Sequence, residues 1–117
     1  MDKIEDLQKR VAEFRDKRDW AQFHNPKDLA IAISIEAAEL LECFRWKTTE
    51  EVRELMGSDK SADVKEEMAD VLLLLLNLAD TTGIDVVAEA HKKLEENDRK
   101  YPVEKSRGSA KKYTELS

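Results

Sequence analysis

The sequence predicts an all-α protein: a four-helix-bundle-like subunit with one extra short helix, assembling as a homo-oligomer. Three observations predict this class. Of 117 residues only 3 are glycine and 2 are proline, while 39% are charged and 41% apolar, which is typical of helical proteins. Apolar residues recur at helical spacing along most of the chain. Five successive leucines, 72–76, leave their helix no polar face, so we expect a second subunit to cover it.

The chain length favours one domain, which we place at residues 1–102, followed by a basic C-terminal tail at 103–117. The net charge of −6 argues against nucleic-acid polymers or anionic membranes as general partners. A single cysteine excludes an internal disulfide and fits a reducing compartment. The N-terminus has no signal-peptide pattern, so we expect a cytoplasmic protein. The leucine run is too short to span a bilayer, which takes about 20 apolar residues.

The first helix is expected at about residues 3–19. Asp2 has the position of an N-cap, and Glu5 stands at the third helical position, where a carboxylate can bond back to the cap. Apolar residues then follow at helical spacing. The stretch from Arg18 to Pro26 holds two aromatic residues and a histidine but has no clean period, so it is expected to be a loop.

Asn25 followed by Pro26 is a strong helix start, because Asn is a preferred N-cap and Pro is tolerated at the first helical position. This second helix is expected to run to about Trp46. A short helix then begins at a threonine cap, residue 48 or 49, and is closed by Gly57.

The third long helix is expected to start within residues 61–63 and to end at about Asp80, with a turn at residues 81–83. Asp85 caps the fourth helix. It stops before Pro102, because proline lacks the backbone donor and disfavours a helical residue before it. The tail that follows is expected to be disordered alone or held by another surface.

Two carboxylate pairs interrupt the apolar faces of the second and third long helices. Glu36 and Glu39 form one pair, and Glu67 and Asp70 form the other. Carboxylates at this spacing lie on one face of a helix, and a solvated face is the simpler interpretation. Both pairs lie in apolar sequence, however, where carboxylates rarely occur without partners. If the helices face each other, the four charges repel unless a cation lies among them, and Mg²⁺ is the natural occupant.

The sequence argues against a di-iron site and excludes an EF-hand. A di-iron carboxylate site in a helical bundle needs Glu-x-x-His on two helices, but alanine stands three residues before both histidines. An EF-hand needs a D-x-D-x-D-G loop, which the sequence lacks. A Mg²⁺ site for phosphoanhydride chemistry remains, in which the ion bridges phosphate oxygens and activates a water for in-line attack. The general base is left open, since a ligand carboxylate such as Glu39 can serve.

A nucleotide site also needs a surface for the base and cations for the phosphates. Trp20, Phe23 and Trp46 flank the second helix and are candidates for stacking on a base, with a place in the core as the alternative. His24 lies among them, and its alternative role is a loop-to-helix hydrogen bond. Lysines and arginines gather around the end of the fourth helix, where most are equally expected to be solvated.

With these residues in place, the chain resembles the all-α nucleoside triphosphate pyrophosphohydrolases of the MazG-like superfamily, and within it the dCTP pyrophosphatase group. The resemblance covers nearly the whole chain. It is carried by Glu36-x-x-Glu39 and Glu67-x-x-Asp70, by Arg18-Asp19-Trp20-x-Gln22-Phe23-His24, by Phe44-Arg45-Trp46-Lys47, by Lys93-x-x-x-Asn97-x-x-Lys100-Tyr101-Pro102, and by the tail Ser106-Arg107-Gly108-Ser109-Ala110-x-Lys112-Tyr113-Thr114-Glu115-Leu116.

The resemblance implies a homotetramer, built as a dimer of dimers, and a role in sanitising the nucleotide pool. It implies Mg²⁺-dependent cleavage of a dNTP, with dCTP or a modified dCTP as the best guess, to a monophosphate and pyrophosphate. It implies that the catalytic residues and Mg²⁺ ligands are Glu36, Glu39, Glu67 and Asp70. It further implies that the substrate is bound by Trp20, Phe23, His24, Trp46, Lys93, Asn97, Lys100 and Tyr101.

Three residues depart from the pattern of that group. Val11 stands where a polar residue, histidine in some relatives, is expected, and Leu74 stands where tyrosine is common. Both positions affect selection of the base or sugar, so a pyrophosphatase for another nucleotide such as dUTP is an alternative. A non-catalytic helical oligomerisation module is a second alternative. Lys100 replaces an arginine, which keeps the charge but loses the bidentate fork.

Overall fold

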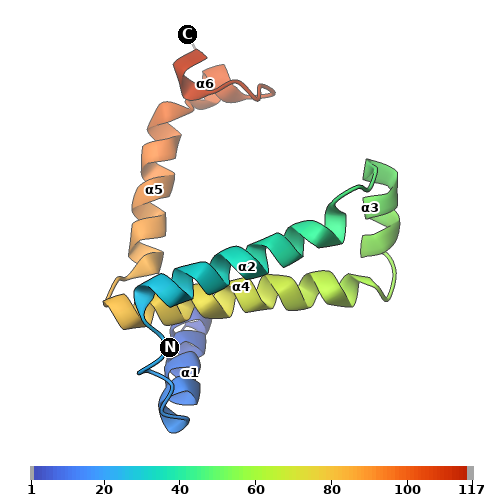
Figure 1. The fold of residues 1–117 in the computed structure, drawn as a ribbon. Coiled ribbons are helices and arrows are strands. Elements are labelled where there is room, and N and C mark those ends of the chain that lie inside the picture. The colour runs from blue at the N-terminus through green and yellow to red at the C-terminus, as the bar shows by residue number, and fades with distance from the viewer. Residues whose placement is uncertain (1, 116–117) are drawn as a thin grey trace. The chain divides into compact units, whose positions relative to one another are not determined.

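The structure, a computed structural model, describes residues 2–115, and these are all-α with no strand among them (Figure 1). This confirms the predicted class and the extra short helix, α3. Met1, Leu116 and Ser117, which the predicted domain and tail include, lie outside the described residues. The elements are α1 (Lys3–Lys17), α2 (Pro26–Phe44), α3 (Thr49–Met56), α4 (Ser61–Thr82), α5 (Val86–Lys100), α6 (Val103–Ser106) and the 3-10 turn η1 (Tyr113–Glu115).

The chain forms two compact units. Met1–Ile84 contains α1 to α4, and Asp85–Ser117 contains α5, α6 and η1. The domain predicted at 1–102 and the four-helix arrangement both extend across this division, so each stays a prediction. Within residues 2–115 no single helix is long and apolar enough to cross a membrane, and α4 with α5 meets the length and composition criteria only when the two are counted together.

The first unit is built on α2 and α4, which lie side by side and antiparallel (Figure 1). Its buried apolar residues are few and come from these two helices: Leu29, Val64, Leu76 and Ala79. Because the helices are antiparallel, the middle of α2 faces the middle of α4, and this sets the two carboxylate pairs opposite each other.

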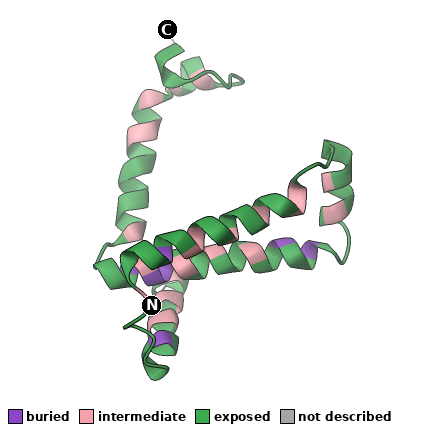
Figure 2. Cartoon of the chain, in the orientation of Figure 1, coloured by how far each residue is buried: buried purple, intermediate pink, exposed green. Residues whose placement is uncertain are grey.

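Most residues of α2 and α4 are coloured as exposed or half-buried in Figure 2. Three of the five leucines in the α4 run, Leu72, Leu73 and Leu75, are 38–39% exposed in the single chain. A run without a polar face is therefore not enclosed by its own chain, and its cover by a second subunit stays a prediction.

Four of the predicted helix starts are confirmed by side-chain caps, and α4 begins at Ser61, as predicted, without one. The side chains of Asp2, Asn25 and Asp85 each accept a backbone N–H three residues on, at 2.8, 2.9 and 3.0 Å. Thr48 forms a capping box with Glu51, in which each side chain accepts the other's backbone N–H at 3.1 Å. These bonds satisfy donors that the first turn of a helix leaves free.

The ends of α1, α2 and α4 differ from prediction by about two residues each, whereas α3 is closed by Gly57 and α5 stops before Pro102, as predicted. α1 ends at Lys17 and α2 at Phe44, because Asp19 (φ 54°) and Trp46 (φ 68°) adopt left-handed backbone conformations that stop a helix. α4 includes Thr82, which was expected in a turn, and ends at Gly83, whose φ of 71° suits a residue without Cβ.

A buried arginine joins α1 to the C-terminal half of α4. The guanidinium of Arg15 donates to Asp80 Oδ2 at 2.8 Å and to Asn77 Oδ1 at 3.1 Å, and its Nε donates to Asp16 Oδ1 at 2.9 Å. The hydrogen bond to Asp16, followed by that to Asp80, raises the pKa of Arg15 above its ordinary value. The charge is therefore paired where it leaves solvent.

The described part of the tail forms short turns against the end of α5. The Tyr113 ring packs edge-on against that of Tyr101, with 6.1 Å between ring centroids, and Lys100 Nζ lies 4.8 Å over the Tyr113 ring. The tail thus contacts the end of α5 through Tyr113 of η1.

Candidate metal and nucleotide site

Three carboxylates meet where the middles of α2 and α4 face each other. Glu36 comes from α2, and Glu67 and Asp70 come from α4; one oxygen of each lies within 4.8 Å of one oxygen of each of the others. Glu36 and Glu67 are half-buried, while Asp70 is exposed. The expected meeting of the two helical pairs is therefore confirmed for these three residues.

Glu67 lies at the centre of the cluster electrostatically. Its pKa is raised to about 7, first by a hydrogen bond between its carboxyl group and that of Glu36, then by partial burial and by the charge of Glu39. Glu39 is exposed and lies outside the group of three, but its carboxyl group is close enough to Glu67 to contribute to the raised pKa of Glu67. All four predicted carboxylates thus lie in this cluster or next to it.

Two oxygens in this cluster are shielded from solvent and have no hydrogen-bond donor among the described residues: Oε2 of Glu36 and Oε2 of Glu67. Two carboxyl groups can form a hydrogen bond with each other when one of them is protonated. The raised pKa of Glu67 favours that protonated state. An ionised carboxylate buried without a donor is unfavourable. Carboxylate oxygens gathered in this way are the donor set of a hard divalent cation, so the residues fit Mg²⁺.

A pocket of about 360 Å³ lies beside α1, the loop after it and α4. Trp20 and His24, two of the predicted base-binding residues, line it, with 6.0 Å between their ring centroids. Val11 and Leu74, the two apolar departures from the family pattern, line the same pocket. Two of the residues predicted to bind the base and the two departures predicted to affect its selection therefore line one cavity.

His24 also makes the loop-to-helix hydrogen bond that stood as its alternative role. Its Nδ1 lies 2.9 Å from Nδ2 of Asn77 on α4. Since His24 also lines the pocket, the two roles are compatible: Nδ1 is held by α4, and Nε2 has no hydrogen-bond partner among residues 2–115.

Phe23 and Trp46 are not brought into this pocket by the single chain. Phe23 is 63% exposed and Trp46 is 84% exposed. Trp46 follows the end of α2, and the guanidinium of Arg45 lies 4.5 Å over its ring. A left-handed backbone is unusual for a bulky residue and is more frequent at functional sites, and Trp46 has one.

The other predicted substrate-binding residues belong to the second unit. Lys93 and Lys100 both pair with Glu96 on α5, at 3.6 and 3.1 Å. The hydrogen bond to Glu96 raises the pKa of Lys100, and the same bond lowers the pKa of Glu96. Asn97 and Tyr101 are linked by a backbone bond of 2.8 Å at the end of α5. Their approach to the phosphates stays a prediction.

The sequence reasoning missed two buried polar residues beside the pocket, Arg15 and Asn77. The sequence could have indicated Asn77, because this polar residue, between Leu76 and Leu78, interrupts an otherwise apolar stretch. Arg15 lies in a run of charged residues, Arg15 to Asp19, and nothing in that run distinguishes it.

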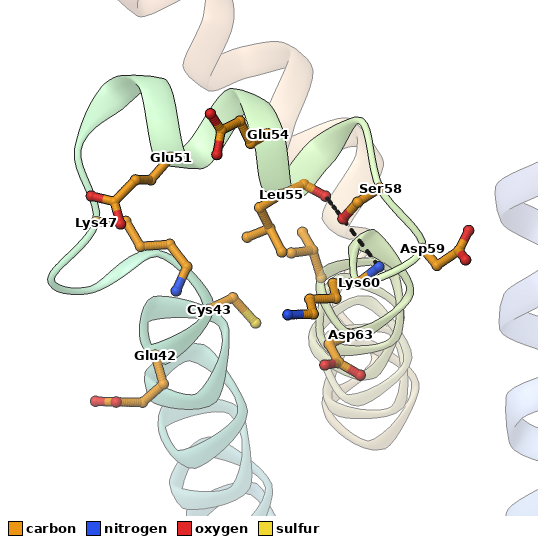
Figure 3. A pocket seen from close by; sticks show the side chains of 11 residues that line it. Glu42, Cys43, Lys47, Glu51, Glu54, Leu55, Ser58, Asp59, Lys60 and Asp63 are labelled. Carbon is orange, nitrogen blue, oxygen red and sulfur yellow. Dashed lines mark hydrogen bonds between the residues drawn. The ribbon is translucent and has the colours of Figure 1, made fainter.

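A second cavity, of about 730 Å³, lies where α3 bridges the C-terminal end of α2 and the start of α4 (Figure 3). The side chains of Lys47 and Lys60 point into it beside Cys43 (Figure 3), and the rest of its wall is mostly acidic. None of the predicted site residues lines this cavity.

The chain is similar to known proteins in sequence and in structure. The MazG-like family model matches residues 31–116, which include both carboxylate pairs. The dCTP pyrophosphatase 1 of Bos taurus is 42% identical over 114 residues, covering 97% of this chain and 68% of that protein. The Homo sapiens dCTP pyrophosphatase 1 is 40% identical, over 97% and 67%.

A solved structure extends the likeness to three dimensions. The crystal structure of a pyrophosphatase from Archaeoglobus fulgidus matches with a TM-score of 0.80 and 45% sequence identity, covering 87% of this chain and 94% of that one. The family match, the identities and the shared fold place the chain in one family. The chain belongs to the MazG-like family.

Proposed function

We propose that this chain is a Mg²⁺-dependent nucleoside triphosphate pyrophosphohydrolase that cleaves a dNTP, with dCTP or a modified dCTP as the first choice, to dNMP and pyrophosphate. Such an activity clears unwanted nucleotides from the pool. The observation that most strongly supports this proposal is the cluster of Glu36, Glu67 and Asp70. Two of its buried carboxylate oxygens lack a hydrogen-bond donor among the described residues. The relatives named dCTP pyrophosphatase support the enzyme class and the choice of base.

In this proposal Glu36, Glu67 and Asp70 hold the ion, with Glu39 beside them. A Mg²⁺ ion held there would supply charge neutralisation for the triphosphate and would lower the pKa of a water. Water adds to the α-phosphorus as the bond to the bridging oxygen breaks, and pyrophosphate leaves. Glu39 is the candidate to take the proton of that water, since it is exposed next to Glu67. Trp20 and His24 hold the base in their pocket.

A homotetramer belongs to the same proposal. The single chain leaves apolar side chains on α2 and α4 uncovered, among them Ile35, Met68 and Leu72, and such contiguous surfaces mark association sites. A neighbouring subunit is expected to cover them. It is also expected to bring Phe23 and Trp46 to the base, and Lys93, Asn97, Lys100 and Tyr101 to the phosphates. Nucleic-acid polymers and membranes are not expected as partners, and the expected location is the cytoplasm.

The composition of the pocket favours one alternative substrate class. Val11 and Leu74 give its wall two apolar side chains where relatives are expected to have polar or aromatic ones, so the preferred base can differ from that of the relatives. A pyrophosphatase for another nucleotide, such as dUTP, is the second candidate.

The decisive experiment is a panel of dNTPs and NTPs assayed for pyrophosphate release with and without Mg²⁺. We expect release from dNTPs only with the ion, and the largest kcat/KM identifies the base. Glu36→Gln and Asp70→Asn should each lower the activity by more than about 100-fold, because each removes a ligand oxygen. Matched controls are Glu42→Gln on α2 and Glu66→Gln on α4, which change exposed glutamates outside the cluster.

Full activity in Glu36→Gln and Asp70→Asn would contradict the metal assignment. Calorimetry that detects neither Mg²⁺ nor nucleotide binding would instead favour a non-catalytic oligomerisation module.

A further inference from the structure

A chain of buried polar groups runs from α1 through α4 to the loop before α2, along the wall of the base pocket. Arg15 is 9% exposed and Asn77 is 5% exposed. Arg15 Nη1 donates to Asn77 Oδ1 at 3.1 Å, and Asn77 Nδ2 lies 2.9 Å from His24 Nδ1. All three residues line the pocket.

The order of donors along this chain fixes each group in turn. A guanidinium only donates hydrogen bonds, so the amide oxygen of Asn77 must face Arg15. Thr81 Oγ1 donates to the same oxygen, at 3.4 Å. The amide nitrogen of Asn77 therefore faces His24, and because it is a donor, His24 Nδ1 must be an acceptor. A neutral imidazole whose Nδ1 accepts carries its proton on Nε2.

We propose that Arg15 and Asn77 are positioning residues that hold His24 in the Nε2–H tautomer, so that the pocket recognises a hydrogen-bond acceptor on the base. That the ligand is a nucleotide base rests on the proposed function. Val11, Leu74 and Trp20 give the pocket apolar walls, and His24 offers its Nε2–H between them. A carbonyl oxygen or an unprotonated ring nitrogen, as on the edge of a pyrimidine, accepts this bond; an exocyclic amino group does not.

The tautomer can be read directly by ¹⁵N NMR of histidine-labelled, full-length protein at about pH 8.5, where imidazole is ordinarily neutral. The chain has 2 histidines, so the exposed His91 is an internal reference, and His91→Gln assigns the signals. We expect Nε2–H at His24 in the wild type. In Asn77→Asp a carboxylate oxygen faces Nδ1, so the proton should move to Nδ1 while His91 is unchanged. Asn77→Asp that keeps the wild-type tautomer at His24 would overturn the proposal.

A second variant guards against misfolding of Asn77→Asp, with folding of both checked by circular dichroism. Asn77→Leu extends the leucine run and removes the restraint, so His24 should show the same tautomer ratio as His91. Retention of a single Nε2–H tautomer at His24 in Asn77→Leu, with His91 showing a mixture, would also overturn it.

Steady-state kinetics of dNTP hydrolysis test whether His24 recognises the base. With Nε2 turned into an acceptor, Asn77→Asp should raise KM by about tenfold and change kcat by less than about twofold, because a ground-state contact to the base is lost. A moved proton with an unchanged KM would refute recognition by His24. If the wild type hydrolyses no dNTP, the proposed function fails, whereas the NMR result still decides the tautomer.

Discussion

At the scale of one residue, Glu67 shows how repulsion among the carboxylates of the candidate site affects the stability of the protein. Its carboxyl group meets Glu36 and Glu39, and no cationic side chain is paired with it in the described part of the chain. Ionisation of Glu67 adds repulsion and desolvation to the folded state that the unfolded chain does not have. A divalent cation would reverse this, since it turns the same repulsion into ligation.

The metal-free protein should therefore lose stability as pH rises through one window. The pKa of Glu67 is 4.5 as an ordinary glutamate and about 7 in the folded protein. Between these values the folded state binds more protons than the unfolded state, so the free energy of unfolding falls as pH rises. Glu67→Gln should flatten this fall. Thermal unfolding at several pH values in the presence of a chelator measures it.

The control for this pH series is Glu66→Gln, which changes the preceding, exposed glutamate. It should follow the wild-type dependence. If Glu67→Gln and Glu66→Gln gave parallel curves, the repulsion assigned to Glu67 would not exist.

Addition of Mg²⁺ above pH 7 should raise the melting temperature of the wild type. A ligand that binds only the folded state stabilises it by about 2.7 kcal/mol when its concentration is about 100 times its Kd. Asp70→Asn should reduce this gain, because it removes a ligand oxygen from the cluster of three. Differential scanning fluorimetry with a Mg²⁺ titration checks it, and an equal gain in wild type and Asp70→Asn would exclude Asp70 as a ligand.

At the scale of elements, Arg15 is the polar link between α1 and α4. Its side chain is 11% exposed and that of Asp80 is 36% exposed, with 2.8 Å between Nη1 and Oδ2. Removal of the cation from a buried pair leaves the partner unpaired, but the partial exposure of Asp80 allows water to compensate in part. The same link orients Asn77, so it couples the helix packing to the pocket wall.

Arg15→Met should lower the free energy of unfolding by about 2 kcal/mol, a value reduced from that of a fully buried pair because of solvent screening. Urea denaturation of the full chain measures the change. Arg53→Met is the matched control, since its ion pair with Glu50 is exposed at 75% and 71%; it should cost less than about 0.5 kcal/mol. Equal losses in both variants would mean that the Arg15 link does not hold α1 on α4.

Local signals explain why the sequence predicted the starts of the helices better than their ends. Asn25 and Thr48 act on backbone groups three residues away, so their caps can be read from short patterns. The ends of α1 and α2 depend on Asp19 and Trp46 in left-handed conformations, which residues other than glycine adopt only under local constraint. The Arg15–Asn77 bond joins residues 62 positions apart, and no short pattern contains it.

At the scale of the whole molecule, the carboxylate cluster was predictable because two repeated spacings on antiparallel helices suffice to bring Glu36, Glu67 and Asp70 together. The exposed Trp46 and the second-unit residues are different. Trp46 belongs to the first unit but is exposed, whereas Lys93, Asn97, Lys100 and Tyr101 belong to the second unit. Helical periodicity carries no information about the contacts that would bring these residues to a nucleotide. What periodicity does indicate is a missing partner: a helix apolar on all sides needs cover on all sides.

A second subunit is expected to cover the leucine run of α4. Leu72 and Leu75 are 38% and 39% exposed in the single chain, and we expect the wild type to be a tetramer in which they are buried. The double variant Leu72→Lys, Leu75→Lys should dissociate it, because a lysine ammonium is rarely buried without a partner. Glu66→Lys, which places the same side chain at an exposed polar position of α4, should leave the assembly intact. Size-exclusion chromatography with light scattering distinguishes the states, and a monomeric wild type would contradict the proposal.

If neighbouring subunits complete the nucleotide site, the dissociated variant should also lose pyrophosphatase activity while its α-helical circular dichroism persists. An active monomer would show that one chain contains the whole site.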